Sequence, residues 1–288
     1  MAEGAIHDLK YKRYTGGRGN PWLRALVVAR WAMVLQLRQR WVKVLFGLGI
    51  IWATVSILKL AMLSLFGNSG LGSAASGLLA NLDREVGITA IEAQQGPTFL
   101  LVLACGAPAL AADLNAGAFQ FHFARPIGVG QYLLGRLLGS AGWSLVLSYG
   151  TFAVLMSVRL VLGGEALTVL KTAALSAGPL GLRVLAMTAV ALGLSSLTRR
   201  KGLAQAMFAG LVAGSWVLLF GVARVAHKPW LEALHVTGSA EALGDMLVLH
   251  RRFGGWYDAV PAVACALWLG LGLGVAAWRL SRAEVVRG

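Results

Sequence analysis

The sequence predicts an all-α integral membrane protein with six transmembrane helices, both termini in the cytoplasm (N-in/C-in), and an amphipathic interfacial helix ahead of the first span. Three observations support this fold class. Of the 288 residues, 57% are hydrophobic and only 13% are charged, whereas ordinary soluble domains carry about 25% charged residues. The apolar residues gather in six long stretches, and the basic residues gather on one side of them. This composition excludes a disordered chain, a collagen and a secreted disulfide scaffold.

The N-terminal segment, residues 1–41, is expected to lie in the cytoplasm and to end in an interfacial helix. Asn20 followed by Pro21 is typical of a helix start, because Asn caps free N–H groups and the φ angle of Pro suits the first turn. Between residues 22 and 41, most polar side chains fall on one half of a helix, and three tryptophans suit the headgroup region. The alternative is a plain basic flank of the first span.

Residues 42–288 are expected to form a transmembrane domain of six helices. A span needs roughly 20 mostly apolar residues, and a helix satisfies its own backbone hydrogen bonds in lipid. The six stretches cover approximately residues 42–66, 96–112, 132–158, 175–197, 203–226 and 259–280. The outer loop at about 227–258 contains two amphipathic stretches, 230–234 and 240–249, which we expect to form short helices that dip toward the bilayer.

Glycines and cysteines inside the spans predict packing rather than chemistry. Three pairs of glycines four residues apart permit close contact between helices. The pairs are Gly135/Gly139, Gly210/Gly214 and Gly270/Gly274. Cys105 and Cys265 lie in apolar stretches and are predicted to be small buried side chains, not a disulfide or a metal site.

The charge distribution orients the chain. With 26 Lys and Arg against 12 Asp and Glu, the formal net charge is +14, which in a soluble protein would indicate nucleic-acid binding. Most basic residues, however, precede the first span, follow the second and fourth spans, or follow the sixth. Because cytoplasmic loops collect Lys and Arg, this pattern places both termini in the cytoplasm. We therefore expect these charges to meet anionic membrane lipids, and we expect no nucleic-acid partner.

The cytoplasmic connection between the second and third spans, residues 113–126, has an unusual composition. It leaves the membrane at an acid, runs through aromatic residues and stops at an Arg-Pro pair. Because Pro disfavours helix at the residue before it, a helix in this segment is expected to end there. Phenylalanines in a connection that faces water require a cover from another protein or from the membrane. The marking residues are Asp113, Gly117, Phe119, Gln120, Phe121, Arg125 and Pro126, and a Tyr-Leu-Leu-Gly-Arg run follows at 132–136.

This segment resembles the membrane (permease) subunits of type-2 ABC transporters, the ABC exporter permease family. In that family an acid, a glycine four residues later, a short stretch around glutamine, an Arg-Pro pair and a Tyr-Leu-Leu-Gly-basic run mark the cytoplasmic ends of the second and third spans. Residues 6–18 are also similar to the opening of bacterial members. The layout of six spans after an amphipathic entry helix matches as well, so the resemblance covers the whole chain in architecture.

The resemblance implies a permease subunit of the bacterial plasma (inner) membrane that works in export. Two permease subunits, identical or different, would form the translocation pathway. Each would sit on a separate cytoplasmic ABC ATPase that binds Mg-ATP. Residues 113–126 would be the coupling helix, held in a groove of the ATPase by its aromatic residues. For Asp113 and Arg125 the alternative is an ordinary helix cap and a topology-setting arginine.

No motif in the sequence predicts catalysis by this chain itself. A Gly-x-x-x-x-Gly-Lys-Ser/Thr phosphate loop is absent, and so are a Gly-x-Ser-x-Gly elbow and a His-Glu-x-x-His zinc helix. We therefore expect neither ATP hydrolysis nor a cofactor or metal in this chain. The first alternative is a secondary carrier or channel not coupled to ATP, although an internal repeat and paired carboxylates in the spans are missing. An intramembrane enzyme is the second alternative.

Two basic residues, Lys59 and Arg183, lie within predicted spans. Because an ionisable group inside a membrane is costly, it is by default a functional hypothesis. The sharper interpretation is a basic lining of the pathway for an anionic or lipid-like substrate. The alternative is that both side chains extend their charged ends toward the outer membrane surface.

Overall fold

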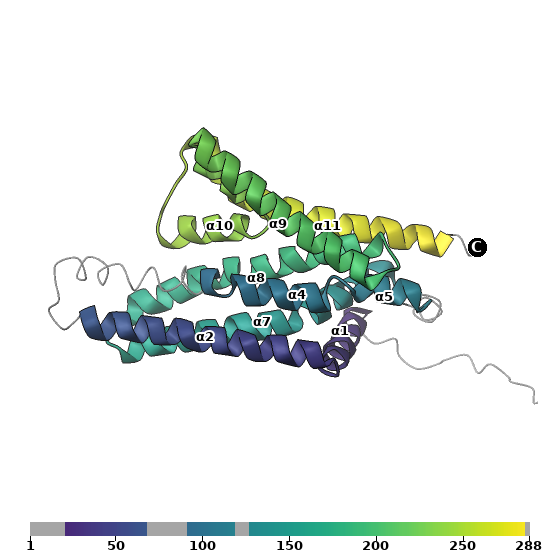
Figure 1. Ribbon diagram of the computed structural model, residues 1–288, viewed down its shortest axis with the longest axis horizontal. Helices are drawn as coiled ribbons and strands as arrows, with labels where there is room; N and C mark the ends of the chain where they lie inside the picture. The colour runs from purple at the N-terminus through teal and green to yellow at the C-terminus, as the bar shows by residue number, and fades with distance from the viewer. Residues whose placement is uncertain (1–20, 68–90, 119–126, 286–288) are drawn as a thin grey trace, which may run out of the picture.

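The computed structural model describes residues 21–67, 91–118 and 127–285, and all regular structure within these residues is helical. The long helices run together along the longest dimension of the molecule (Figure 1). In chain order the elements are α1 (Pro21–Leu37), α2 (Arg40–Gly67), α4 (Gln95–Cys105), α5 (Ala109–Asn115), α7 (Val129–Val161), α8 (Ala166–Ser196), α9 (Lys201–Ala226), η1 (Pro229–Leu234), α10 (Gly238–Val248), η2 (Gly255–Ala259) and α11 (Val260–Val285). The two η elements are 3-10 helices.

Six helical stretches among the described residues are long and apolar enough to cross a membrane, which confirms the predicted number. They are Arg40–Lys59, Gln95–Asn115, Val129–Val161, Ala166–Ser196, Lys201–Ala226 and Gly255–Arg282. The fourth differs most from the prediction, because it begins at Ala166 rather than at 175. The added part contains Lys171, and a charge near the end of an apolar stretch hides the helix from a search for unbroken apolar residues.

α1 is helical from Pro21, the first described residue, but it ends at Leu37 instead of continuing to 41. The predicted cap Asn20 lies outside the described residues. A tight turn follows, in which the N–H of Gln39 donates to the carbonyl of Gln36 at 3.0 Å. The turn separates α1 from α2, and Figure 1 shows the two helices pointing in different directions. Residues 22–41 are therefore one helix and the start of a second.

α1 packs on α7 through small residues on both helices. Ala25, Ala29 and Ala32 are buried on α1. A Cβ atom added at Gly135 would lie 2.7 Å from the carbonyl oxygen of Ala25, and one at Gly139 would lie 2.6 Å from the Cβ of Ala32. The predicted Gly135/Gly139 pair therefore makes a close helix contact, as small residues do in membrane proteins. The large apolar side chains of α1 are exposed instead, namely Trp22, Leu23, Leu26, Val27, Trp31, Val34 and Leu35.

Replacing Gly139 with leucine is expected to loosen α1 from α7. The new side chain has no space beside Ala29 and Ala32, and overpacking of this kind typically costs about 1–3 kcal/mol. Thermal unfolding of the purified chain in detergent, followed by tryptophan fluorescence, measures the loss. Gly150→Leu is the matched control, because Gly150 lies in the same helix and has no atom within 4 Å of an added Cβ. Equal unfolding temperatures of the two variants would contradict the packing.

α8 lies at the centre of the bundle, where it packs against α7, α9, α10 and α11. Its contact with α11 is a second glycine contact, since a Cβ added at Gly193 would lie 2.7 Å from the carbonyl oxygen of Gly272. The other two predicted pairs, Gly210/Gly214 and Gly270/Gly274, have no atom within 4 Å of an added Cβ. The prediction of contacts at those pairs is therefore wrong for the described part of this chain, and Gly272, which lies between Gly270 and Gly274, makes the contact on α11.

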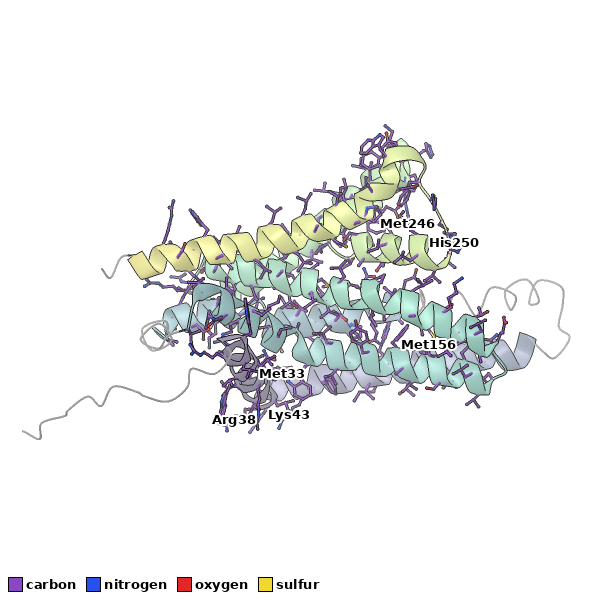
Figure 2. The ribbon with its side chains drawn as sticks, turned by 180° about the vertical axis from the view of Figure 1, so that it is seen from behind. Met33, Arg38, Lys43, Met156, Met246 and His250 are labelled. Carbon is purple, nitrogen blue, oxygen red and sulfur yellow. The ribbon has the colours of Figure 1, made fainter. Side chains whose placement is uncertain are left out.

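The segment between α9 and α11 contains the two predicted short helices, η1 and α10. α10 packs on α8, α11 and η1. Figure 1 shows α10 between α8 and the ends of α9 and α11 that splay away from α8. In Figure 2, Met246 and His250 mark this end of the bundle, which we call the α10 end. Met33, Arg38 and Lys43 mark the opposite end, which we call the α1 end (Figure 2).

Candidate functional site

The second span is broken into α4 and α5, and the break sets the direction of the turn that carries Asp113. Pro108 has no N–H with which to continue the hydrogen bonds of α4. In the first turn of α5, the N–H of Ala111 donates to the hydroxyl of Ser195 in α8 at 2.9 Å. This bond satisfies one of the free N–H groups at a helix start. It fastens α5, and with it Asp113, to the central helix of the bundle.

Asp113 joins α5 to α7. Its Oδ2 atom accepts hydrogen bonds from the Tyr132 hydroxyl and from Nη2 of Arg136. Nε of Arg136 also donates to the Tyr132 oxygen at 3.1 Å. Tyr132 and Arg136 are four residues apart on α7, so both side chains lie on the same face of that helix. Tyr132 is fully buried and the Asp113 side chain is only 13% exposed, so water screens this ion pair weakly.

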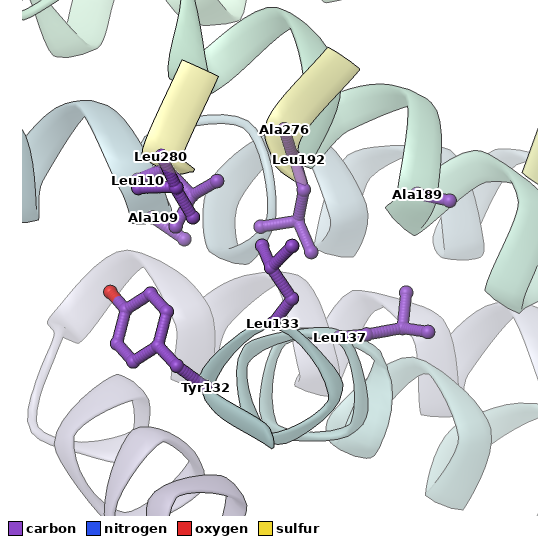
Figure 3. Packing of buried hydrophobic residues seen from close by; sticks show 9 residues of the cluster. All are labelled: Ala109, Leu110, Tyr132, Leu133, Leu137, Ala189, Leu192, Ala276 and Leu280. Carbon is purple, nitrogen blue, oxygen red and sulfur yellow. The ribbon is translucent and has the colours of Figure 1, made fainter. Parts of the chain in front are cut away.

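An apolar cluster supports this polar network. Its nine buried side chains come from α5, α7, α8 and α11, and Figure 3 shows Tyr132 at the edge of the cluster. The members are Ala109, Leu110, Tyr132, Leu133, Leu137, Ala189, Leu192, Ala276 and Leu280. Closely packed interiors transmit displacement because they hold few voids. α5 is therefore packed in one continuous cluster with parts of α7, α8 and α11.

α5 ends sooner than the sequence predicts. Its last residue is Asn115, and Gly117 follows with φ +63°, a conformation that glycine adopts without steric cost. The N–H of Ala118 donates to the Asp113 carbonyl at 3.0 Å, which is the bond that closes a helix end of this type. The expected single helix over 113–126 therefore needs correction, because Asp113 belongs to α5 and Gly117 terminates that helix. The other predicted coupling residues, Phe119, Gln120, Phe121, Arg125 and Pro126, lie outside the described residues.

The two basic residues of the predicted pathway lie in different environments. Lys59 is exposed at the end of the first candidate span. Arg183 is only 1% exposed, and it lies about 26 Å along α8 from Ala166 at 1.5 Å per residue. Arg183 is therefore buried near the middle of its helix and does not extend to a surface. Both basic groups act on Glu92: burial raises the pKa of the Glu92 carboxyl, and the charges of Arg183 and Lys59 oppose that rise.

Arg183 is held by residues outside the six candidate spans. Its Nη1 donates to the backbone carbonyl of Ile91 and lies 3.5 Å from Oε1 of Glu241 in α10. Because α10 lies against α8, the Glu241 carboxylate contacts the Arg183 guanidinium, which is shielded from water. Burial raises the pKa of the Glu241 carboxyl, and the charge of Arg183 opposes this rise. This ion pair fastens α10 to the fourth span.

Three residues of these two networks were not among the site residues that the sequence predicts: Tyr132, Arg136 and Glu241. For the first two, a usable signal exists, since an acid at the end of one span faces a tyrosine and an arginine spaced four apart at the start of the next. For Glu241 the signal is weak. An acid in the first turn of a short helix is ordinarily explained by the helix dipole, and nothing in the sequence links it to Arg183.

The described residues offer no metal centre, because no three His, Cys, Asp or Glu side chains among them are arranged to hold an ion. Cys105 and Cys265 are free and buried, as the sequence predicts. A scan against models of known protein families and a search of curated proteins both gave no match. The function is therefore inferred from the residues and their geometry.

Proposed function

We propose that this chain is a permease subunit of an ATP-binding cassette transporter that works in export. With a second permease subunit, identical or different, it would form a pathway driven by separate cytoplasmic ATPase subunits that bind Mg-ATP. The observation that carries the proposal is the Asp113–Tyr132–Arg136 network. It ties together the two ends of the connection that resembles the coupling segment of type-2 ABC permeases.

Through this network, a force applied to the connection between α5 and α7 would act on both helices. An ATPase that pushes on residues between Gly117 and Gly128 would pull on Asp113 in α5 and on Arg136 in α7. Both helices enter the apolar cluster beneath, which also contains parts of α8 and α11. A rigid-body shift of the second and third spans is the kind of transition that such a push would drive.

The charges at the two ends support an α1 end in the cytoplasm. Arg38 and Lys43 lie at the α1 end (Figure 2). At the α10 end the basic Arg251 and Arg252 are accompanied by four acids, Glu92, Glu232, Glu241 and Asp245. Cytoplasmic segments of membrane proteins collect basic residues. The proposed location is the bacterial plasma membrane with both termini inside, and the connection after α5 would then face a cytoplasmic ATPase.

The exposed spans leave room for a second subunit. Large apolar side chains of α2 and α9 are exposed in the single chain, including Ile51, Trp52, Val217 and Leu218. Such faces contact lipid or another protein in a membrane. A dimer of permease subunits would cover part of them.

Replacing Asp113 with asparagine is expected to lower ATPase activity coupled to the permease by roughly tenfold. The neutral amide leaves Arg136 without its counter-ion, and the two spans lose their link. The measurement is ATP hydrolysis by the complex purified from membranes, with and without the variant. Glu165→Gln is the control, because Glu165 is an exposed carboxylate at the outer start of α8. Membrane insertion of both variants should equal that of the unchanged chain.

The proposal fails if no ATPase copurifies with the chain after mild extraction and transport continues without nucleotide. That result would favour a secondary carrier or a channel. Normal coupling in Asp113→Asn, with a copurifying ATPase, would instead reject only the role given to the network.

A further inference from the structure

A cavity of about 400 Å³ lies at the α10 end. Its walls come from the last turns of α9, from η1, from α10 and from the chain that follows α10. Four carboxylates and two guanidinium groups line it, namely Glu92, Glu232, Glu241, Asp245, Arg251 and Arg252. The volume is within the range of small-molecule sites, which are commonly 300–1,000 Å³.

The carboxylates are poorly satisfied by the protein itself. Oε1 of Glu241 lies 3.5 Å from Arg183 and Oδ2 of Asp245 lies 3.5 Å from Arg251. Even so, Oε1 of Glu241 and Oδ1 of Asp245 are buried and accept no hydrogen bond from any described residue. Buried polar atoms are nearly always paired in folded proteins, and each exception calls for a missing partner. Two such oxygens on one wall are therefore free to accept a donor that is not among the described residues, such as a ligand in the cavity.

Arg183 closes the inner side of this cluster. It is 1% exposed, and its Nη1 is directed at the Glu241 carboxylate on the cavity wall. Nε and Nη2 of the same guanidinium make no hydrogen bond with any described residue. Burying a charge at this depth costs free energy, and residues that do so are usually paired and functional. The Arg183–Glu241 ion pair therefore leaves hydrogen-bonding atoms of both side chains without a partner among the described residues.

The charge balance of the cavity favours a cation. Around the space, four acids face two lining arginines and the buried Arg183 behind Glu241, so the acids outnumber the basic groups by one. One of the lining arginines, Arg251, is two-thirds exposed and screened by water. Burial raises the pKa of the Glu92, Glu241 and Asp245 carboxyls, and neighbouring acids add to the rise at Glu92 and Glu241. A bound positive group would offset both the burial and the mutual repulsion.

The remaining wall is apolar. Phe220 of α9 and Phe253 face the same space as the acids, together with Pro229, Ala233 and Ala242. An inorganic ion would gain nothing from these side chains, and no described group of ligands is arranged to hold a metal. A compound that carries both a hydrogen-bond-donating positive group and an apolar body matches the two kinds of wall.

We infer that this cavity binds an amphipathic organic cation, with an ammonium or guanidinium group among Glu241, Asp245 and Glu92 and its apolar part against Phe220 and Phe253. The site belongs to the single chain and needs no ATPase. It therefore goes beyond the proposed function, and its test does not depend on coupling.

The test compares three small probes of nearly equal shape on the purified full chain in nanodiscs of zwitterionic lipid. They are 2-phenylethylammonium, the neutral 2-phenylethanol and the anionic 3-phenylpropanoate. Calorimetric titration should show saturable binding of one ammonium per chain, roughly tenfold tighter than binding of the other two, because hydrogen bonds to charged groups exceed neutral ones by that much. Trp230 on η1 offers a fluorescence readout beside Pro229 and Glu232.

Matched variants assign the binding to this cavity. Asp245→Asn and Glu241→Gln should each weaken ammonium binding about tenfold, whereas Arg252→Gln should strengthen it by removing a like charge. Glu165→Gln, an exposed carboxylate outside the cavity, should leave it unchanged. If Glu241→Gln does not fold, Asp245→Asn decides the question, because its partner Arg251 is exposed and needs no replacement.

Three results would overturn the inference. The first is no saturable ammonium binding by the unchanged chain. The second is equal binding of all three probes, which would indicate partition into lipid or apolar surface. The third is ammonium binding by Asp245→Asn that equals that of the unchanged chain.

Discussion

Replacing Gly272 with valine is expected to separate α11 from α8 and to leave little folded chain in detergent. A Cβ atom at Gly272 would lie 2.4 Å from both the carbonyl carbon and the carbonyl oxygen of Ala189, and 2.6 Å from the amide nitrogen of Val190. These are backbone atoms of a helix, which cannot rotate away as a side chain does. The cost should therefore exceed the roughly 1–3 kcal/mol of ordinary overpacking.

Gel-filtration profile and thermal unfolding of the purified chain measure this effect. Gly270→Val and Gly274→Val are matched controls on the same helix, since neither position has an atom within 4 Å of an added Cβ. All three substitutions change intrinsic helix propensity in the same direction and to a similar degree, since valine is a somewhat better helix former than glycine. Only Gly272→Val should unfold the chain, and equal losses in the three variants would show that the α8–α11 contact is not as close as described.

Gly270, Gly272 and Gly274 also show which feature of the fold the sequence pattern does not determine, namely the face of a helix that meets its neighbour. Apolar stretches of the right length predict six spans, because each helix must satisfy its backbone in lipid whatever its neighbours are. Which face of a span meets another span depends on the neighbour, and a sequence rich in glycine contains several candidate faces. The Gly135/Gly139 pair makes the predicted contact, whereas on α11 the contact is made by Gly272, two residues from either predicted glycine.

The residues of the candidate site also fall into two groups, those that the sequence predicts and those that only the packing brings together. Asp113 and Gly117 are visible in the sequence because they lie close together and precede a proline-terminated segment. The structure adds a reason for each, an ion pair with Arg136 and a left-handed helix end. The partner of Arg183 is not visible, since Glu241 lies in a segment that composition alone assigns to an outer loop. Only the packing of α10 against α8 brings the two together.

The Arg183–Glu241 ion pair yields the second large expected effect. Replacing Glu241 with leucine should destabilise the chain by about 3–5 kcal/mol, because it leaves a guanidinium buried without a counter-ion. Arg183→Met should cost less, since the remaining carboxylate lines the cavity and can reach water or take up a proton. The double variant, Arg183→Met with Glu241→Leu, should be more stable than Glu241→Leu alone. An apolar pair of similar volume often replaces a buried ion pair without loss.

Unfolding free energies of the four chains form a double-mutant cycle, in which the non-additive part measures the interaction. The Asp245–Arg251 pair provides the comparison, because it has the same 3.5 Å separation but an arginine that is two-thirds exposed. Asp245→Ala should cost less than about 1 kcal/mol, as exposed pairs do. If Asp245→Ala and Glu241→Leu cost the same, burial is not what gives the Arg183 pair its strength. A cycle without coupling would mean that α10 is held against α8 by its small apolar face alone.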